Sequence, residues 1–330
     1  MNEPQPDNRP PLLVLVGPTA VGKTALSLQI AKAFNCEIIS GDSMQVYRGM
    51  DIGTAKLPLD DREDVPHHLI DICSPEHPFS VSEFQSLCTE KIRDIHSRGK
   101  LPFIVGGTGL YVESVCYGFR FQERGADEKF RNEMAAFARE NGAEALHAKL
   151  AEVDPVSASK LHPNDERRVI RALEVYNETG KPLSEIQEQS RGDERRSPYR
   201  LCLIGLTMDR AKLYERINER VDQMLEDGLV QEVKTLLSQN VPRGAVSMQG
   251  LGYKEIAAYL EGETDLETAV STLKQDTRRF AKRQLSWFRH MRGLEWADVG
   301  AVPKNSELFR MICAIIAGKF HCDMEYIFQE

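Results

Sequence analysis

The sequence has 330 residues, is 41% hydrophobic and 28% charged, and carries a formal net charge of −8 at pH 7. These values predict a globular protein with one large or two modest domains, and the longest apolar runs are too short to cross a bilayer. Seven cysteines without paired spacing argue against a disulfide framework, and the polar start of the chain lacks an export pattern. We therefore expect a cytoplasmic protein without membrane contact. The acidic charge argues only weakly against a polyanionic partner, because phosphate neutralisation is local.

The first part of the chain alternates predicted strands with predicted helices. A polar, proline-rich leader at 1–11 is expected to be disordered, and the apolar run at 12–16 is typical of a strand buried on both faces. The elements predicted next are helices and strands at 24–34, 37–40, 81–97 and 102–105. This alternation predicts a doubly wound parallel α/β domain.

The character of the sequence changes at about residue 121. Charge-rich helical segments without strands run from there to residue 198 and predict a helical insertion domain. A buried strand at 199–209 then returns to the core, and further helices are predicted at 210–226, 229–238 and 273–291. The core domain is accordingly expected to comprise 12–120 and 199–300, while the tail at 301–330 receives no role.

A phosphate-binding loop is predicted between the first strand and the first helix. Its glycines let the backbone wrap an anion, Lys23 supplies a positive charge, and the hydroxyl of Thr24 can hold Mg²⁺. The candidate residues are Gly17, Pro18, Thr19, Ala20, Val21, Gly22, Lys23 and Thr24. The loop itself does not say which phosphorylated compound is bound.

Asp42 follows the second predicted strand, within a Gly-Asp-Ser turn. An acidic residue at this place either helps to hold a metal, as in nucleotide hydrolases, or accepts a proton from a nucleophile. The end of the strand at 102–105 offers Gly106, Gly107 and Thr108, which suit backbone approach to a phosphate and a hydroxyl contact. Asp42 is therefore the better candidate base, against the alternative of an aspartate in a solvated turn.

Three groups of basic residues are candidates for binding phosphates. Arg216 and Arg220 are four residues apart on one helix face, where they could close over a diphosphate or form an ordinary solvated face opposite an apolar stripe. Two further groups have the helical spacing of a nucleic-acid surface, although each could equally be an ordinary solvated face. The first comprises Arg278, Lys282, Arg289 and Arg292, with Phe280, Gln284, Trp287 and Met291 expected on the opposite face, and the second comprises Arg167, Arg168 and Arg171.

An ordered series of motifs in this chain resembles the bacterial tRNA dimethylallyltransferases, which prenylate an adenosine beside the anticodon. The series spans about residues 12–292 and reads GPTAVGKT, SGDSMQVYRGMDIGTAK, PHHLID, FSVSEFQ, VGGTGLY, NDERRVIRALEV, LYERINERVDQMLEDGLVQEV, QGLGYKE and AKRQLSWFR. A match of this length and order is far more specific than the phosphate loop alone.

The resemblance implies a fold like that of the phosphate-loop NTPases and a defined reaction. The enzyme would transfer a dimethylallyl group from dimethylallyl diphosphate to the N6 amine of the adenosine 3′-adjacent to the anticodon, and release diphosphate. The loop would hold this diphosphate, with Mg²⁺ on Thr24, and Asp42 would accept the proton from the amine. Lys23 and the pair Arg216 and Arg220 would neutralise the leaving group, and Thr108 would lie at the reacting centre.

The resemblance also implies which residues contact tRNA. The basic stripe itself predicts that Arg278 and Lys282 hold the tRNA backbone, and the resemblance implies that the adenosine flips out of its stack. The remaining matched positions are Asp42, Ser43, Met44, Gln45, Arg131, Asp165, Glu166, Arg167, Arg168, Val169, Ile170, Ser247, Met248, Gln249, Gly250, Leu251 and Gly252. Ser286 stands where the family often has threonine, and the tail matches nothing in the family.

Two other functions share the phosphate loop. A prenyltransferase acting on free adenine nucleotides would need neither basic clusters nor a helical insertion. A phosphate-loop kinase of small molecules would bind ATP and need an acceptor pocket. We expect a monomer that takes tRNA and dimethylallyl diphosphate as its partners.

Overall fold

The computed structural model describes residues 7–119, 121, 127–192, 197–301 and 305–321. The chain divides into two compact units, one formed by Met1–Gly118 with Ser197–Glu330 and the other by Phe119–Arg196. Residues 1–6 of the expected leader lie outside the described residues, whereas Pro11 already belongs to the first strand.

The larger unit contains a six-stranded sheet in which every strand pair is parallel. The strands lie in the order β3-β2-β4-β1-β5-β6. Their bounds are β1 Pro11–Val16, β2 Cys36–Ser40, β3 His67–His68, β4 Leu101–Gly106, β5 Arg200–Thr207 and β6 Leu294–Asp298. The prediction of a doubly wound α/β fold is confirmed, and the short strands β3 and β6 are additional to the predicted ones.

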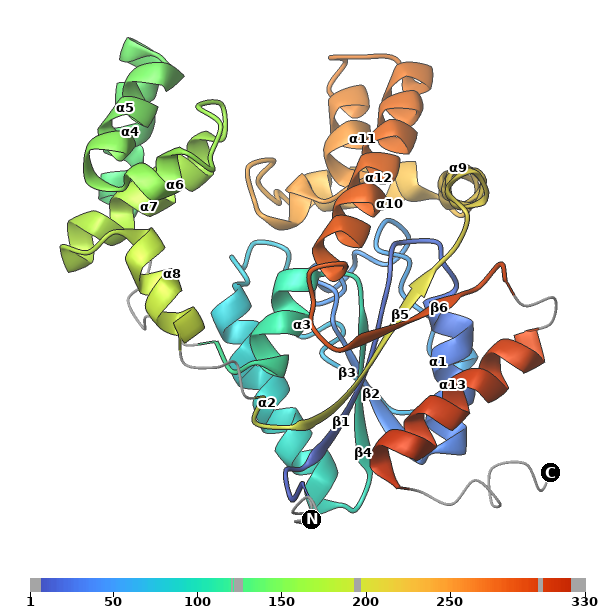
Figure 1. Ribbon diagram of the computed structural model, residues 1–330. Coiled ribbons are helices and arrows are strands. Elements are labelled where there is room, and N and C mark those ends of the chain that lie inside the picture. Colours follow the sequence, from blue (N-terminus) through green and yellow to red (C-terminus); the bar gives the residue numbers. More distant parts are fainter. Residues whose placement is uncertain (1–6, 120, 122–126, 193–196, 302–304, 322–330) are drawn as a thin grey trace. The chain divides into compact units, whose positions relative to one another are not determined.

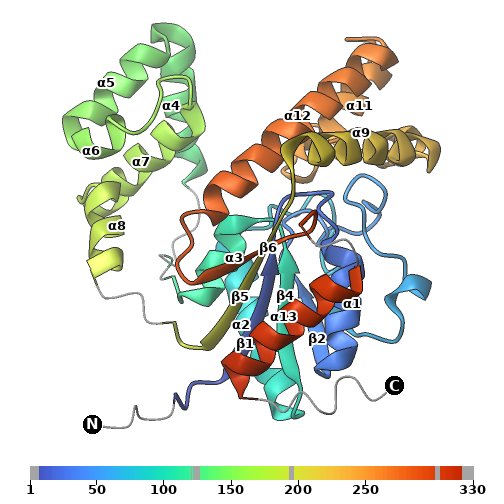
Figure 2. The ribbon, with the colours of Figure 1, turned by 45° about the vertical axis from the view of Figure 1, so that its right-hand side comes forward.

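Strand β1 is buried on both faces because helices cover both sides of the sheet. Leu12, Val14 and Val16 pack into one hydrophobic cluster, and the alternate residues Leu13 and Leu15 pack into another. Helices α2 (Val81–Ser97) and α3 (Gly109–Cys116) cover the first face, and α1 (Lys23–Ala33) covers the second. Figures 1 and 2 show these layers.

Four helices lie beyond the carboxyl ends of the strands (Figures 1 and 2). They are α9 (Arg210–Glu226), α10 (Leu229–Ser238), α11 (Tyr253–Leu260) and α12 (Leu266–Phe288). Helix α12 begins seven residues earlier than predicted, because Asp265 caps it by accepting the N–H of Thr268 at 2.8 Å. Helix α11 has no counterpart among the predicted elements.

The tail contributes a helix to the core. Helix α13 (Asn305–Phe320) places Leu308, Ile312, Ile316 and Phe320 on one stripe at four-residue spacing, and all four are buried. They join the cluster on the α1 face of the sheet, so the tail covers an apolar surface that would otherwise meet water.

The smaller unit is helical, as the sequence predicts for this region. Its helices are α4 (Glu128–Asn141), α5 (Ala143–Val153), α6 (Pro155–Ala158), α7 (Glu166–Thr179) and α8 (Leu183–Gly192). Leu146 and Leu150 of α5 pack with Val169 and Leu173 of α7 in a separate core. Among the described residues of both units, no helix is long and apolar enough to cross a membrane.

Candidate functional site

The phosphate loop joins β1 to α1, as the sequence predicts. Gly17 is required because a Cβ there would lie 2.8 Å from the carbonyl oxygen of Leu206 on β5. Gly22 caps α1 with a φ of 104°, a left-handed conformation that favours glycine, and no side chain bonds the first N–H groups of the helix. Ala20 has a φ of 63°, a strained value for a residue with a Cβ. The loop therefore leaves helix N–H groups available to an anion.

A cavity of about 620 Å³ opens beside this loop, at the carboxyl ends of the strands. Asp42 after β2 and Gly106 and Gly107 at the end of β4 line it. Further lining comes from the phosphate loop, the start of α1, and helices α9 and α12: Thr19, Gly22, Lys23, Thr24, Arg216, Glu219, Arg220, Gln223 and Gln284. The structure thus brings together the predicted diphosphate residues of α9 and of the loop.

Lys23 begins α1 and folds back over the loop. Its Nζ donates to the carbonyl oxygens of Gly17 at 3.0 Å and of Pro18 at 2.7 Å. Burial is the main reason that the pKa of Lys23 is lowered to about 7; the nearby Arg220 contributes to this lowering, whereas Asp42 opposes it. A half-buried ammonium whose bonds, among the described residues, go to neutral carbonyls is a favourable place for a phosphate oxygen.

The arginine pair of α9 flanks the same cavity. The guanidinium of Arg216 lies over the loop, since a Cβ on Gly22 would be 4.0 Å from its Nη1 atom. Burial lowers the pKa of Arg220, and Asp42 partly offsets this effect. Within the described residues, neither guanidinium makes a hydrogen bond or an ion pair. Three cations without a carboxylate partner therefore surround one cavity, which suits an anion with several negative charges.

Asp42 is the acidic residue of this cavity on the β2 side. Its Oδ1 accepts the N–H of Met44 at 2.8 Å, which fixes the side chain in a local turn. The hydroxyl of Thr108 accepts the N–H of Ser43 at 3.0 Å and donates to the Ser43 hydroxyl at 3.3 Å. Thr108 thereby holds the backbone next to Asp42, and its predicted place at the reacting centre stays a prediction.

Gly106 and Gly107 line the cavity, and their predicted approach to a phosphate stays a prediction; the packing gives a further reason for glycine at both positions. A Cβ on Gly106 would overlap the backbone of Gly41, and a Cβ on Gly107 would overlap the Nε2 atom of Gln284. Both glycines are needed because other parts of the chain approach them. Sequence reasoning placed Gln284 opposite the basic ridge but gave it no role, although a polar residue on a buried helix face is a signal in itself.

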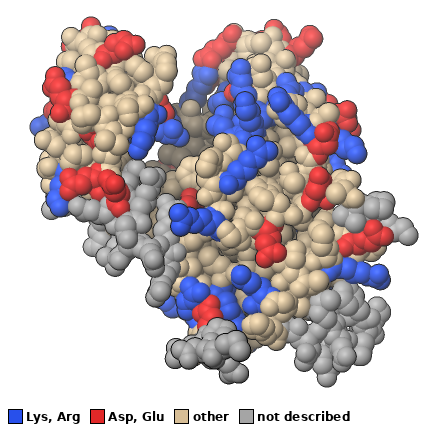
Figure 3. Space-filling model, viewed as in Figure 1, with Lys and Arg blue, Asp and Glu red and all other residues tan. Residues whose placement is uncertain are grey.

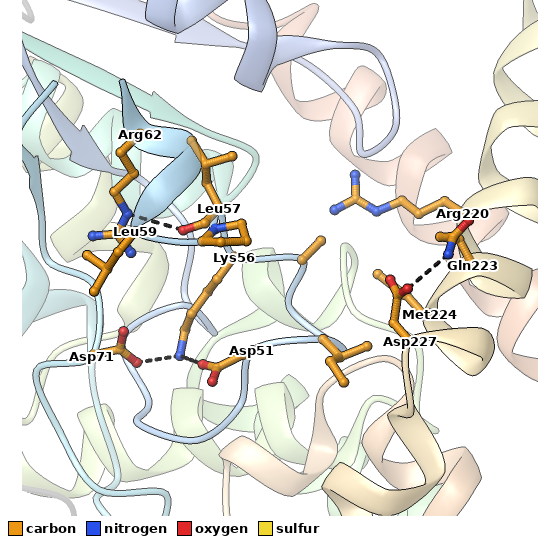
Figure 4. A pocket seen from close by; sticks show the side chains of 13 residues that line it. Asp51, Lys56, Leu57, Leu59, Arg62, Asp71, Arg220, Gln223, Met224 and Asp227 are labelled. Carbon is orange, nitrogen blue, oxygen red and sulfur yellow. Dashed lines mark hydrogen bonds and ion pairs between the residues drawn. The ribbon is translucent and has the colours of Figure 1, made fainter. Parts of the chain in front are cut away.

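A second cavity of about 660 Å³ adjoins the first (Figure 4). The two share lining from Ala55, Leu57, Arg220 and Gln223. Its other cations, Lys56 and Arg62, both have partners. The Nζ of Lys56 contacts Asp51 at 2.7 Å and Asp71 at 2.5 Å and also donates to a backbone carbonyl, and Arg62 donates to the carbonyl of Leu57 at 3.1 Å. Figure 4 shows Arg220 extending from α9 toward the opposite wall. Arg220 is therefore the unpaired charge common to both cavities.

Several residues predicted to contact tRNA have structural partners in the larger unit. The amide of Gln45 accepts from the Ser40 hydroxyl at 2.8 Å and donates to the carbonyl of Thr54 at 3.2 Å, so it holds the loop that lines both cavities. Ser247 and Met248 are fully buried, whereas Gln249 is exposed. The side chains of Ser247 and Met248 therefore fix the segment 247–249 to the interior of the larger unit.

The inner face of α12 agrees in part with the expected one. Gln284 and, just after the helix, Met291 are buried as expected, whereas Trp287 is 41% exposed. Thr277, Ala281 and Phe288 complete the buried face. On the outer side of the helix, Lys282 is exposed, and Arg278 donates to the side chain of Asn218 at 2.6 Å. The other exposed cations of the helix and of the residues just after it are Arg279, Arg283, Arg289 and Arg292. Figure 3 shows Lys and Arg gathered over the part of the unit that carries α11 and α12.

The predicted tRNA contacts in the smaller unit include a buried ion-pair cluster. Arg131 donates to both oxygens of Glu174, at 2.9 and 3.0 Å, and Arg171 donates to one of them at 2.6 Å. Val169 and Ile170 are buried within the core of this unit. Of the predicted tRNA contacts at the start of α7, Arg167 and Arg168 are exposed. Arg168 pairs with Asp165 at 3.2 Å, and Glu166 is half-buried.

A metal ion in this cavity would have to take most of its coordinating oxygens from the bound phosphate compound and from water. In the described part of the chain, no group of three or more His, Cys, Asp or Glu residues is arranged to hold a metal ion. Mg²⁺ commonly uses only one or two protein oxygens and takes the others from phosphate and water. The exposed hydroxyl of Thr24, in the first turn of α1 and on the cavity wall, fits that use.

The fold and the cavity define a phosphate-loop protein with several basic residues around a cavity next to a carboxylate. The model of the IPP transferase family matches residues 45–291, and a model described as isopentenyl transferase matches residues 10–62. The chain belongs to the IPP transferase family, whose curated relatives are named tRNA dimethylallyltransferases. The resemblance identified from the motifs is thus confirmed, and the protein is a transferase.

Individual relatives match over nearly their whole length. The tRNA dimethylallyltransferase of Bacillus licheniformis is 52% identical over 94% of this chain and 98% of its own, and that of Bacillus subtilis is 53% identical over 95% and 98%. The crystal structure of the tRNA isopentenylpyrophosphate transferase of Bacillus halodurans is 50% identical, covers 94% of this chain and 96% of its own, and has a TM-score of 0.71. A eukaryotic dimethylallyltransferase acting on tRNA is 32% identical, with a TM-score of 0.79 over 96% and 81%.

Proposed function

We propose that this protein transfers a dimethylallyl group from dimethylallyl diphosphate to the N6 amine of the adenosine 3′-adjacent to the anticodon of tRNA. The family assignment supports this reaction. The single observation that carries it is the cavity in which Lys23, Arg216 and Arg220, bonded to no carboxylate of the described residues, surround the phosphate loop beside Asp42.

In the proposed reaction, the N6 nitrogen attacks the allylic carbon as the bond from that carbon to the diphosphate oxygen breaks. The diphosphate leaves with the electron pair of this bond, and the N6 nitrogen loses a proton to Asp42. An exocyclic amine is a weak nucleophile, so most of the acceleration must come from stabilising the negative charge of the leaving group. Lys23 and the arginine pair are the residues placed for that task.

Magnesium is the proposed cofactor. Bound Mg²⁺ would add positive charge to the leaving diphosphate, and the Thr24 hydroxyl is the protein ligand that we assign to it. The side chains of the cavity retain their roles: Lys23 and Arg220 orient the diphosphate oxygens, and Asp42 takes the proton. The turn around Asp42, held by Met44 N–H and Thr108, orients the carboxylate.

The tRNA is proposed to bind through its phosphates to the exposed cations of the α12 region, among them Lys282 and Arg278, and to Arg167 and Arg168 of the smaller unit. The adenosine must leave its stack to reach Asp42. We further propose that the protein acts as a monomer in the cytoplasm, where its acceptor tRNA is found and where free thiols such as those of Cys88 and Cys116 stay reduced.

The test is a comparison of acceptors. The protein is incubated with radiolabelled dimethylallyl diphosphate and Mg²⁺, together with unmodified tRNA or AMP, and in parallel with ATP and a metabolite mixture. We expect label in tRNA, at the adenosine next to the anticodon, with release of one diphosphate per transfer. Label in AMP but not in tRNA would indicate the free-nucleotide enzyme, and formation of ADP would indicate a kinase.

A further inference from the structure

A buried amide connects the phosphate loop to α12. The Oε1 atom of Gln284 accepts the N–H of Thr19 at 2.9 Å, and its Nε2 atom donates to the carbonyl of Gly107 at 2.9 Å. These partners determine the orientation of the amide, because a backbone N–H can only donate and a carbonyl can only accept. The side chain is 6% exposed, so both hydrogen bonds are shielded from water.

The three segments are packed too closely for this contact to be incidental. A Cβ on Gly107 would overlap Nε2 of Gln284 and would lie 3.6 Å from the carbonyl oxygen of Gly17. The start of the phosphate loop, the end of β4 and the C-terminal part of α12 therefore meet at one point. The amide supplies the acceptor and the donor that two of these segments need there.

The loop requires such an anchor because its conformation is costly. Ala20 holds a left-handed φ of 63°, and a strained backbone persists only where its surroundings hold it. Lys23 now helps by bonding the carbonyls of Gly17 and Pro18. Once Lys23 bonds a diphosphate oxygen instead, those carbonyls lose that support, and Gln284 remains as the side chain that holds the first half of the loop.

We propose that Gln284 is a positioning residue that keeps the phosphate loop in its diphosphate-binding conformation and fixes it to α12. The proposal rests on the proposed function in taking diphosphate as the ligand. Gln284 acts through the backbone of Thr19, so its loss weakens diphosphate binding without removing any charge from the cavity. Binding of tRNA, which depends on cations elsewhere, changes little.

The experiment compares two substitutions in the full chain. Gln284→Met has nearly the same shape and loses both hydrogen bonds, whereas Gln284→Glu keeps the acceptor for Thr19 but loses the donor to Gly107 and adds a negative charge. Titration calorimetry with inorganic diphosphate and Mg²⁺ should show a dissociation constant about tenfold to thirtyfold higher for Gln284→Met. Gln284→Glu should bind diphosphate still more weakly, because its charge lies beside the cavity.

A matched control lies about two turns earlier on the same helix. Thr277 is also buried, and its hydroxyl donates to the carbonyl of Leu273 at 2.7 Å, away from the loop. Thr277→Val should leave diphosphate affinity within about twofold of the parent. In all three variants the affinity for unmodified tRNA, measured without diphosphate, should stay within about twofold.

Two results would overturn the proposal. One is a folded Gln284→Met variant that binds diphosphate like the parent, and the other is an equal loss in Thr277→Val, which would indicate a general loosening of α12. The proposed function is judged separately. A parent protein that binds diphosphate but prenylates no tRNA would contradict that function and leave the comparison of variants readable.

Discussion

The two compact units of this protein treat arginine side chains differently. In the helical unit, Arg131 and Arg171 both donate to the buried carboxylate of Glu174. In the larger unit, Arg216 and Arg220 lie at a cavity without an ion pair to any described carboxylate. The first arrangement satisfies its charges within the fold, and the second leaves them for a ligand.

The pKa shifts distinguish charged residues that are paired within the fold from charged residues that have no partner among the described residues. Burial raises the pKa of Glu174, but the hydrogen bonds from Arg131 and Arg171 prevail, and the net pKa lies below its usual value. At Lys23 and Arg220, burial prevails and lowers the pKa, because no described anion is bonded to either side chain. Charge that is desolvated without compensation costs stability, and such sites are commonly where a protein binds or reacts.

The largest expected effect is at Asp42, the carboxylate within the cationic cavity. Asp42→Asn keeps an oxygen to accept the Met44 N–H but cannot take a proton at neutral pH, so the single-turnover rate should fall by about 10²- to 10⁴-fold. Affinity for tRNA should fall no more than several-fold. A Mg²⁺ titration is the control: substantial recovery of the rate at high metal would show that Asp42 holds the ion and is not the base.

The paired cluster predicts a loss of stability confined to its own unit. Glu174→Leu leaves both arginines without their carboxylate and should lower the opening free energy of amides in α5 and α7 by about 2 to 4 kcal/mol. Hydrogen exchange on the full chain measures this, with the amides of β1 as the internal reference. Because the folded pKa is depressed, the contribution of Glu174 is present above pH 4.5 and is lost as pH falls through that lower pKa. Weaker diphosphate binding in this variant would contradict the view that the ion pairs of Glu174 serve only the stability of the helical unit.

Matched arginine substitutions test the distinction directly. Arg220→Met should raise the dissociation constant of inorganic diphosphate about tenfold to a hundredfold, because a charge-assisted contact is lost from a desolvated cavity. Arg171→Met removes an arginine from the paired cluster and should leave that constant unchanged. Calorimetry on both variants gives the comparison, and equal binding by Arg220→Met and the parent would remove Arg220 from the diphosphate site.

The smallest effect concerns the proton on Lys23. With a pKa of about 7, Lys23 is mostly neutral at pH 8 in the free protein, and a bound diphosphate favours its charged form. Binding at pH 8 should therefore take up close to one proton at this site, and affinity should weaken by up to about tenfold per pH unit above 7. Calorimetry in buffers of different ionisation enthalpy measures the uptake. Lys23→Arg is the control, because a guanidinium does not titrate in this range and should show none of it.

The sequence by itself determined those features of the protein that depend on residues close to one another along the chain. The run at 12–16 has to be a doubly buried strand, and the glycines and Lys23 that follow have to form an anion-binding turn at a helix start. Alternating strands and helices determined the parallel sheet, and the spacing of Arg216 and Arg220 placed both on one face of α9. The ordered motifs determined the family.

Only the tertiary structure decided which side chains meet across distant segments. The contact between Gln284 and Thr19 joins residues 265 positions apart. The local pattern on α12 indicates that Gln284 is a buried polar residue, but it does not indicate which residue is its partner. The same holds for the tail, whose apolar stripe gains meaning only against the α1 face of the sheet. Whether a charged residue is paired depends on the partners that folding brings close to it. Folding brings Glu174 to Arg131, whereas it brings no carboxylate of the described residues into contact with Arg220.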